Sequence, residues 1–188
     1  MKIITGYIPA TSGSAEVCGL DLSEKSLEVR KMVGYLPEHN PLYLDMYIAE
    51  YLLFAAGIAG VKNTKKALET AIELTQLGPE RNKKIGQLSK GYRQRVGLAQ
   101  ALIHDPKVLI LDEPTANLDT ITEHSLLDAL YHVMGNRTTL LITHRLVGLD
   151  VVDEILVMDK GRVVERGCHN ELLEARGLYR RMWDLQNQ

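Results

Sequence analysis

Apolar runs that end in polar side chains recur along the chain and predict the strands of a sheet. Val108 to Leu111 is an unbroken aliphatic run, which is typical of a strand covered on both faces in a parallel sheet. Val33 to Leu36, Thr138 to Thr143 and Glu154 to Met158 are further runs that predict strands. After the last of them, a tight turn from Asp159 to Arg162 predicts an antiparallel hairpin.

Helical spacing of apolar residues is clearest between about residues 45 and 104. Lys65 to Leu77 carries an apolar stripe opposite its charges, and Tyr47 to Ala59 shows the same spacing. Ser89 is a good N-cap for a helix that we expect from about Gly91 to His104. The sequence also predicts the tail of a helix at Met1 to Tyr7 and a helix from Thr120 to Met134 whose start fits a capping box. Two short helices are predicted at 170–175 and 178–185. This alternation predicts an α/β fold with a mainly parallel sheet.

Composition narrows the class of protein but does not identify it. The 188 residues are 45% hydrophobic and 24% charged, which suits one globular domain with a buried core. The formal net charge of −2 argues against a protein held to nucleic acid by bulk charge. The longest mostly apolar run, Tyr51 to Val61, is shorter than the roughly 20 residues of a membrane span, so the sequence predicts a soluble cytoplasmic chain.

Charged side chains follow three of the predicted strands at the point where each strand ends. Glu38 comes after the first strand, Asp112 and Glu113 after the second, and His144 after the third. Because the carboxyl ends of parallel strands meet at one edge of a sheet, we expect these four residues to converge. Acids and a histidine together there would suit a metal-assisted reaction with a polarised water. Solvated strand-end turns and a packing histidine are the alternatives that these residues also fit.

The stretch Leu88 to Arg95 adds a second kind of site. Ser89 followed by Gly91 at a helix N-terminus leaves free backbone N–H groups, which together with the helix dipole attract an anion. The lack of a side chain at Gly91 would allow a phosphate to approach the backbone. The alternative is a helix that is simply capped.

Taken in order, these residues resemble the nucleotide-binding subunit of ATP-binding cassette (ABC) transporters, and the resemblance covers essentially the whole chain. Up to about Asp119 the chain is more similar to ABC-2 and gliding-type subunits, and from Thr143 onward to the thiol exporters of cytochrome bd assembly. The matching motifs are Tyr35–Glu38 for the Q-loop, Leu88–Tyr92 for the signature, Val108–Asp112 for Walker B with Glu113 after it, Ala116–Asp119 for the D-loop and His144 for the switch histidine.

The resemblance implies two such domains that hold two ATP molecules between them, with Mg²⁺, and drive transport by dimer closure and hydrolysis. It implies that Asp112 serves Mg²⁺, that Glu113 polarises the attacking water and that His144 contacts the γ-phosphate. It further implies that the signature residues Ser89, Lys90 and Gly91 contact the ATP of the opposite subunit. Asp119 is implied to communicate across the dimer, and Glu38 to lie near Mg²⁺. The implied partners are a second nucleotide-binding domain and a transmembrane subunit facing residues 39–60, with the chain peripheral on the inner face of the membrane and no nucleic acid bound.

The sequence departs from the family pattern in three places. Glu38 replaces the usual Gln, and Lys90 and Tyr92 replace Gly and Gln of the signature. The Walker A motif G-x-x-x-x-G-K-[ST] is absent, and the nearest spacing, Gly86 to Gly91, is followed by Tyr and Arg. Met1 to Gly6 resembles the helix that follows Walker A, so we expect a cassette that is truncated at its N-terminus and whose sheet has a gap or a new strand pairing.

The sequence therefore predicts a partial P-loop NTPase (RecA-like) domain over residues 1–188. The α/β core is expected at 1–38 and 105–188, and a helical subdomain that includes the signature at 39–104. The leading hypothesis is an ATP-hydrolysing subunit of an ABC transporter. The alternative is a non-catalytic module that supplies only Ser89 and Gly91 to a complete partner. A soluble ABC ATPase acting on ribosomes or DNA is disfavoured because the chain has one cassette and no basic bias.

Overall fold

The computed structural model describes residues 1–116, 118–135 and 137–187, which form two compact units, Met1–Ile142 and Thr143–Gln188. The first unit contains β1 (Glu16–Val17), β2 (Leu20–Asp21), α1 (Leu22–Met32), β3 (Val33–Leu36), α2 (Ile48–Ile58), α3 (Thr64–Leu74), α4 (Lys90–Leu102), β4 (Val108–Asp112), α5 (Thr120–Met134) and β5 (Thr138–Ile142). The second contains β6 (Ile155–Asp159), β7 (Arg162–Gly167), α6 (His169–Glu174) and α7 (Leu178–Gln186). The predicted boundaries at residues 38 and 105 stay predictions.

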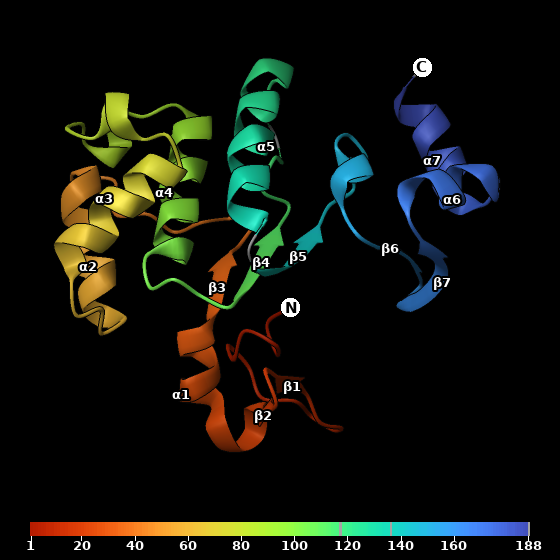
Figure 1. Cartoon of the computed structure of the whole chain (residues 1–188), viewed down its shortest axis with the longest axis horizontal. Helices are drawn as coiled ribbons and strands as arrows, with labels where there is room; N and C mark the ends of the chain where they lie inside the picture. Colours follow the sequence, from red (N-terminus) through yellow and green to blue (C-terminus); the bar gives the residue numbers. More distant parts are fainter. Residues whose placement is uncertain (117, 136, 188) are drawn as a thin grey trace. The chain divides into compact units, whose positions relative to one another are not determined.

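A three-stranded parallel sheet in the order β3-β4-β5 lies at the centre of the first unit (Figure 1). Leu36 pairs with Leu111, and Asp112 with Ile142, so the carboxyl ends of all three strands meet at one edge. This confirms the parallel arrangement that the apolar runs predict. Within the described residues no further strand pairs with β3 or β5, and the predicted gap in the sheet stays a prediction.

The side chains of β4 alternate between two apolar layers. Leu109 and Leu111 pack with Leu98, Leu126 and other buried residues of α4 and α5 on one face of the sheet. Ile110 packs on the opposite face with apolar residues of α1 and of the N-terminal segment. Because successive strand residues point to opposite faces, Asp112 must share the face of Ile110. The strand is buried on both sides, which explains its unbroken aliphatic sequence.

Helices α2, α3 and α4 form a group of their own beside the sheet (Figure 1). Their shared core includes Ile48, Leu52, Ile72 and Val96, which are almost completely buried. Helix α4 also packs on β3, and at that contact Gly34 lies so close to the carbonyl of Ala101 that a Cβ atom would be 2.3 Å from the oxygen. The helix that begins at Ser89 is thereby fixed to both the helical group and the sheet.

Several sequence expectations need correction. The sequence patterns did not predict α1, because most of its residues are polar or charged. The expected helix tail at Met1 to Tyr7 is a hydrogen-bonded turn, and α3 ends at Leu74, since Gln76 adopts a left-handed conformation with φ of 54° before Gly78. The cap of α5 is Asp119 rather than Thr120, because the Asp119 carboxylate accepts the N–H of Thr122. Asn136, expected at the end of this helix, lies outside the described residues.

A buried arginine joins α4 to its neighbours. The Arg95 guanidinium, 7% exposed, donates to the Thr75 carbonyl at 2.9 Å and to the Ser125 carbonyl and hydroxyl at 2.7 Å each. It also reaches the Gln76 side chain at 3.1 Å. These acceptors lie after α3 and within α5, so one side chain holds the signature helix to both.

Replacing this arginine by lysine should destabilise the fold. In Arg95→Lys, one ammonium cannot span the two separated carbonyls, so at least one buried acceptor loses a charged donor. We expect a loss of about 1.5–3 kcal/mol in the free energy of unfolding, measured by urea denaturation. Arg81→Lys is the matched control, since Arg81 forms an exposed ion pair with Glu69 and its replacement should change stability only slightly. Equal effects of the two substitutions would contradict this role of Arg95.

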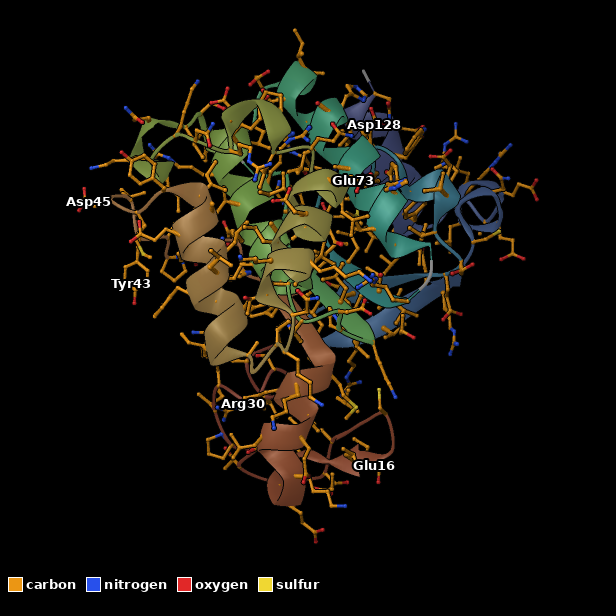
Figure 2. All side chains as sticks on the ribbon, turned by 60° about the vertical axis from the view of Figure 1, so that its left-hand side comes forward. Glu16, Arg30, Tyr43, Asp45, Glu73 and Asp128 are labelled. Atoms are coloured by element: carbon orange, nitrogen blue, oxygen red, sulfur yellow. The ribbon has the colours of Figure 1, made fainter. Side chains whose placement is uncertain are left out.

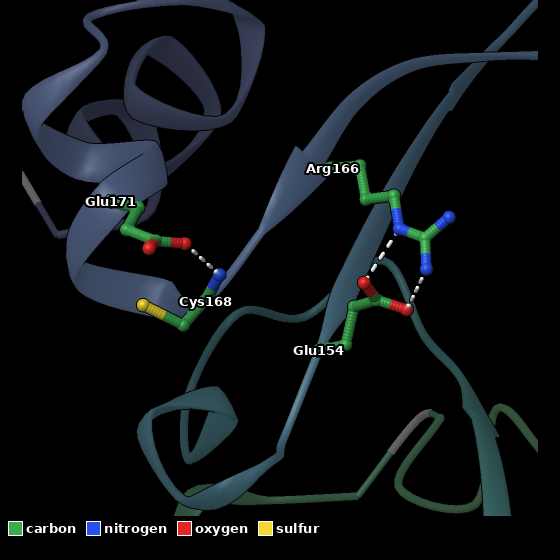
Figure 3. A network of polar contacts seen from close by, with 4 residues as sticks. All are labelled: Glu154, Arg166, Cys168 and Glu171. Carbon is green, nitrogen blue, oxygen red and sulfur yellow. Dashed lines mark hydrogen bonds and ion pairs between the residues drawn. The ribbon is translucent and has the colours of Figure 1, made fainter.

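The second unit is an antiparallel hairpin followed by two short helices. Strands β6 and β7 pair from Ile155–Gly167 to Asp159–Arg162, which confirms the predicted hairpin. Figure 3 shows the bidentate Arg166–Glu154 pair across the hairpin and the Glu171 carboxylate accepting the Cys168 N–H at the start of α6. These local contacts set the ends of the elements in this unit.

Among the residues that the structure describes, no helix combines the length and the apolar character needed to cross a lipid bilayer.

Candidate functional site

Asp112 ends β4 with its carboxylate held by a tyrosine of the neighbouring strand. The Tyr35 hydroxyl donates to Asp112 Oδ2 at 3.1 Å. Strand register explains the contact, because Tyr35 pairs with Ile110 and therefore shares a face with Asp112. Burial, and then the contact with Asp112, raises the pKa of Tyr35 to about 12, so the hydroxyl remains a donor at neutral pH. This hydrogen bond restrains the orientation of the Asp112 carboxylate through one of its two oxygens.

Glu113 follows immediately and has an unusual backbone. Its φ of 48° lies in the left-handed region, which is uncommon for a residue with a side chain. Its N–H donates to the Ile142 carbonyl at 2.9 Å, and its carbonyl accepts the Ala116 N–H at 3.0 Å, so the turn is anchored to β5 and to the following loop. Strained backbone of this kind concentrates at functional sites, where the surrounding structure holds it in place.

The start of α4 presents the second predicted site. Ser89 and Lys90 are exposed, and the Ser89 hydroxyl accepts the Tyr92 N–H at 3.4 Å, which confirms Ser89 as the N-cap. Gly91 is buried, because the methyl group of Thr122 lies against it. A Cβ atom on Gly91 would be 2.1 Å from Thr122 Cγ2. Close packing against the Thr122 side chain therefore favours glycine here, whether or not a phosphate approaches.

Asp119 lies next to this contact as the cap of α5. Its carboxylate accepts the Thr122 N–H at 3.0 Å, and hydrogen bonding by Thr122 lowers the pKa of Asp119. Since Thr122 also touches Gly91, the N-termini of α4 and α5 lie together, and the predicted residues Ser89, Gly91 and Asp119 belong to one region. Asn117 of the same predicted loop lies outside the described residues.

Glu38 lies two residues beyond β3 and is solvent-accessible. Its carboxylate is 3.8 Å from His39 Nδ1, a long surface contact that restrains it weakly. The nearby residue Asn40 lies against α4 at Gly97, where a Cβ atom would be 1.8 Å from Asn40 Nδ2. A glycine in the middle of α4 thus allows the segment after Glu38 to sit close to the helix.

His144 lies two residues after β5, at the beginning of the second unit, and its predicted convergence with Asp112 and Glu113 stays a prediction. Within its own unit the histidine is exposed and sits in a turn where Thr143 Oγ1 accepts the Arg145 N–H at 2.9 Å. The Gln186 side chain of α7 donates to the His144 carbonyl at 2.7 Å. The backbone of this segment is therefore held by side chains on both sides.

Among the described side chains no group of three or more His, Cys, Asp or Glu residues could by itself enclose a metal ion. Carboxylates are ligands that Mg²⁺ uses, and it is commonly held by one or two of them together with waters and substrate phosphates. Asp112, at the end of a rigid strand, is the residue that fits this role.

Three residues make contacts at these sites that the sequence patterns did not predict. Tyr35 could have been found from strand alternation, because it shares a face with Asp112 once the register is known. For Thr122 the sequence offers one local indication of a contact, its position three residues after an N-cap. Gln186 carries no local signal, since its partner is 42 residues away in the sequence.

Comparison with known proteins gives consistent matches. Residues 1–116 match the family model described as "ABC transporter". The lactococcin-A transport/processing ATP-binding protein LcnC of Lactococcus lactis subsp. lactis is 35% identical over 97% of this chain and 26% of its own length. The ATP-dependent lipid A-core flippase of Xanthomonas oryzae pv. oryzae is 36% identical over 99% of this chain and 33% of its own length.

The solved structures include a similar fold. A bacterial Atm1-family ABC exporter with ATP bound superposes with a TM-score of 0.84 at 28% identity, covering 100% of this chain and 34% of that one. The chain thus spans about a quarter to a third of the length of these relatives. The superposition confirms the P-loop NTPase fold class that the sequence predicts.

Proposed function

Because the chain belongs to the ABC transporter family and corresponds to its ATP-binding part, we propose that Asp112 and Glu113 act in the hydrolysis of ATP bound between two such domains. The observation that carries the proposal is the placement of both carboxylates at the carboxyl end of β4, the middle strand of the sheet. Ligands of open parallel sheets bind at this edge.

Each residue has a separate part in this proposal. Asp112, oriented by Tyr35, helps to hold Mg²⁺, which when bound neutralises charge on the phosphates. Glu113 orients the attacking water and accepts its proton, for which the anchored turn at its backbone provides a fixed position. The nucleotide of the opposite domain is contacted by the start of α4, through Ser89, Lys90 and Gly91 and the N–H groups of the helix. Asp119 contacts the opposite domain. His144 contacts the γ-phosphate, and Glu38 lies near the metal.

The partner in the proposal is a membrane-embedded subunit or domain that docks on the segment after Glu38, with the chain on the inner face of the membrane. Several large apolar side chains of this segment and of α2 are exposed: Tyr43, Leu44, Tyr47, Phe54 and Ile58. Figure 2 shows Tyr43 and Asp45 pointing outward beside α2. A hollow of about 510 Å³ lined by Tyr43, Tyr51 and Phe54 could receive an apolar segment of such a partner.

The second candidate function is donation of the signature residues to a complete partner without catalysis. The observation that supports it is that Ser89 caps α4 and Gly91 lies in the first turn of this helix, so the residues that such a module would supply are together at one helix start. Both functions require association with a second domain in the presence of MgATP.

The 188-residue chain by itself should bind ATP weakly. A phosphate loop normally surrounds the β- and γ-phosphates with backbone N–H groups and a lysine, and the sequence contains no such motif. We expect isothermal titration calorimetry to give a dissociation constant of about 1 mM or weaker. Micromolar affinity would contradict this expectation and indicate another phosphate-binding element in the chain.

Association tests the proposed function itself. For this purpose we define the completed cassette as this chain joined at its N-terminus to the strand and phosphate loop of a relative. We expect sedimentation velocity to show a dimer of the completed cassette with MgATP and a monomer with MgADP. A monomer in both nucleotides would contradict ATP-driven pairing, and therefore both candidate functions.

A further inference from the structure

The C-terminal helix reaches back to the segment that contains His144. Gln186 Nε2 donates to the His144 carbonyl at 2.7 Å, and Gln186 Oε1 accepts the Leu146 N–H at 2.9 Å. One amide group therefore satisfies a backbone acceptor and a backbone donor two residues apart, a pairing that fixes both its own orientation and theirs. Leu146 is also buried, which further restrains this segment.

Helix α7 is itself held firmly enough to act as a support. Its first N–H groups, those of Leu178 and Tyr179, are both accepted by the Glu165 carboxylate of β7, the second at 3.0 Å. Gly177 allows this approach, since a Cβ atom there would be 2.2 Å from Glu165 Oε1.

The buried face of α7 adds a second attachment. Tyr179, 1% exposed, is 2.7 Å from His169 Nδ1 through its hydroxyl, and the His169 ring meets the Trp183 ring edge-on at 4.8 Å. Tyr179 and Trp183, which lie one turn apart on the helix, thus both contact His169 of α6. The last turn, which carries Gln186, is consequently held in place relative to the rest of the unit.

We propose that Gln186 is a positioning residue that fixes the backbone of His144 for its contact with the γ-phosphate. The inference rests on the role proposed for His144 and adds the structural device that holds it. Thr143 Oγ1 restrains the Arg145 N–H from the strand side, and Gln186 restrains the residues on either side of Arg145 from the helix side. The imidazole then projects from a backbone that has little freedom to rotate.

The first test uses amide hydrogen exchange by NMR on the 188-residue chain, which needs no nucleotide. In Gln186→Leu the Leu146 N–H loses its acceptor, and we expect its exchange to become about 3- to 10-fold faster. Gln186→Glu keeps an acceptor for Leu146 but removes the donor to His144, so Leu146 should stay protected. Leu185→Ala is the control, because this neighbouring residue is 72% exposed. It should leave the exchange of the Leu146 N–H unchanged.

The exchange result decides the structural half of the proposal. Faster exchange confined to the His144–Leu146 segment, with β6 and β7 unchanged, supports a local clamp. Unchanged exchange of Leu146 in Gln186→Leu overturns the proposal, and so does a general loss of protection throughout the unit, which would indicate only a role in stability.

The second test measures ATP turnover by the dimer of the completed cassette defined above. We expect Gln186→Leu and Gln186→Glu to lower kcat about 10-fold with KM for ATP within about 2-fold, because misplacement of a contacting group affects the chemical step more than binding. His144→Ala is the comparison. If His144→Ala lowers turnover and the Gln186 variants do not, the positioning role is overturned. If His144→Ala has no effect, the role proposed for His144 itself is overturned.

Discussion

Replacing Ser89 by aspartate should strongly weaken ATP-driven pairing without unfolding the chain. Aspartate caps a helix as well as serine does, so the start of α4 should keep its stability. A carboxylate at this exposed position would, however, face the γ-phosphate of the opposite domain. At about 4 Å the repulsion between two negative charges near a protein surface amounts to about 4 kcal/mol, so we expect association to weaken by about 10²- to 10³-fold.

The measurement is sedimentation velocity of the completed cassette over a range of MgATP concentrations, together with thermal unfolding. Ser89→Thr is the matched variant, because it keeps both the hydroxyl and the cap without adding charge. We expect it to pair normally. If Ser89→Asp pairs as well as the unsubstituted protein, the proposed contact of Ser89 with the nucleotide is contradicted, and Ser89 only caps the helix.

Replacing Gly91 by alanine should reveal how tightly the starts of α4 and α5 are packed. The added methyl would be 2.1 Å from Thr122 Cγ2, so either the Thr122 side chain must leave its rotamer or the two helices must move apart. We expect a loss of about 1–3 kcal/mol in stability, although alanine normally stabilises a helix interior relative to glycine by about 0.5–1 kcal/mol. The measurement is urea denaturation of the 188-residue chain.

Two further variants show whether this effect comes from the contact with Thr122. Gly57→Ala in α2 is the control, because a Cβ atom at that position would have no atom of the described neighbouring residues within 4 Å, and the substitution should be stabilising. Thr122→Ser removes the methyl that alanine would strike, so the double variant Gly91→Ala with Thr122→Ser should recover most of the lost stability. Failure of the double variant to recover would contradict a direct clash.

The strand-end residues were predictable because strands of a buried parallel sheet have a strong local signal. The aliphatic run before Asp112 places the carboxylate at a sheet edge without any knowledge of tertiary structure, and Ser89 is recognisable as a cap from its neighbours alone. Helix α1 was missed because its mean hydropathy is low and only Val29 is buried on it. Local patterns thus find elements with a strong apolar signal and miss those with a weak one.

Contacts between distant segments could not be predicted from the sequence patterns. Nothing local indicates that Gly91 touches Thr122 or that Gln186 binds the backbone at His144, since these pairs meet only after the helices have packed. The cap of α5 was misplaced by one residue because Asp119 and Thr120 are both good N-cap residues, and only the hydrogen bond to Thr122 distinguishes them.

Glu113 is the residue on which the proposed mechanism depends most, and single-turnover hydrolysis of ATP by the completed cassette tests its role most directly. Glu113→Gln keeps the size of the side chain but cannot accept a proton, so we predict that hydrolysis slows by about 10²- to 10⁴-fold while MgATP still drives dimer formation. Glu16→Gln, an exposed residue of β1, is the control and should hydrolyse normally. Hydrolysis at an unchanged rate in Glu113→Gln would contradict the proposed mechanism.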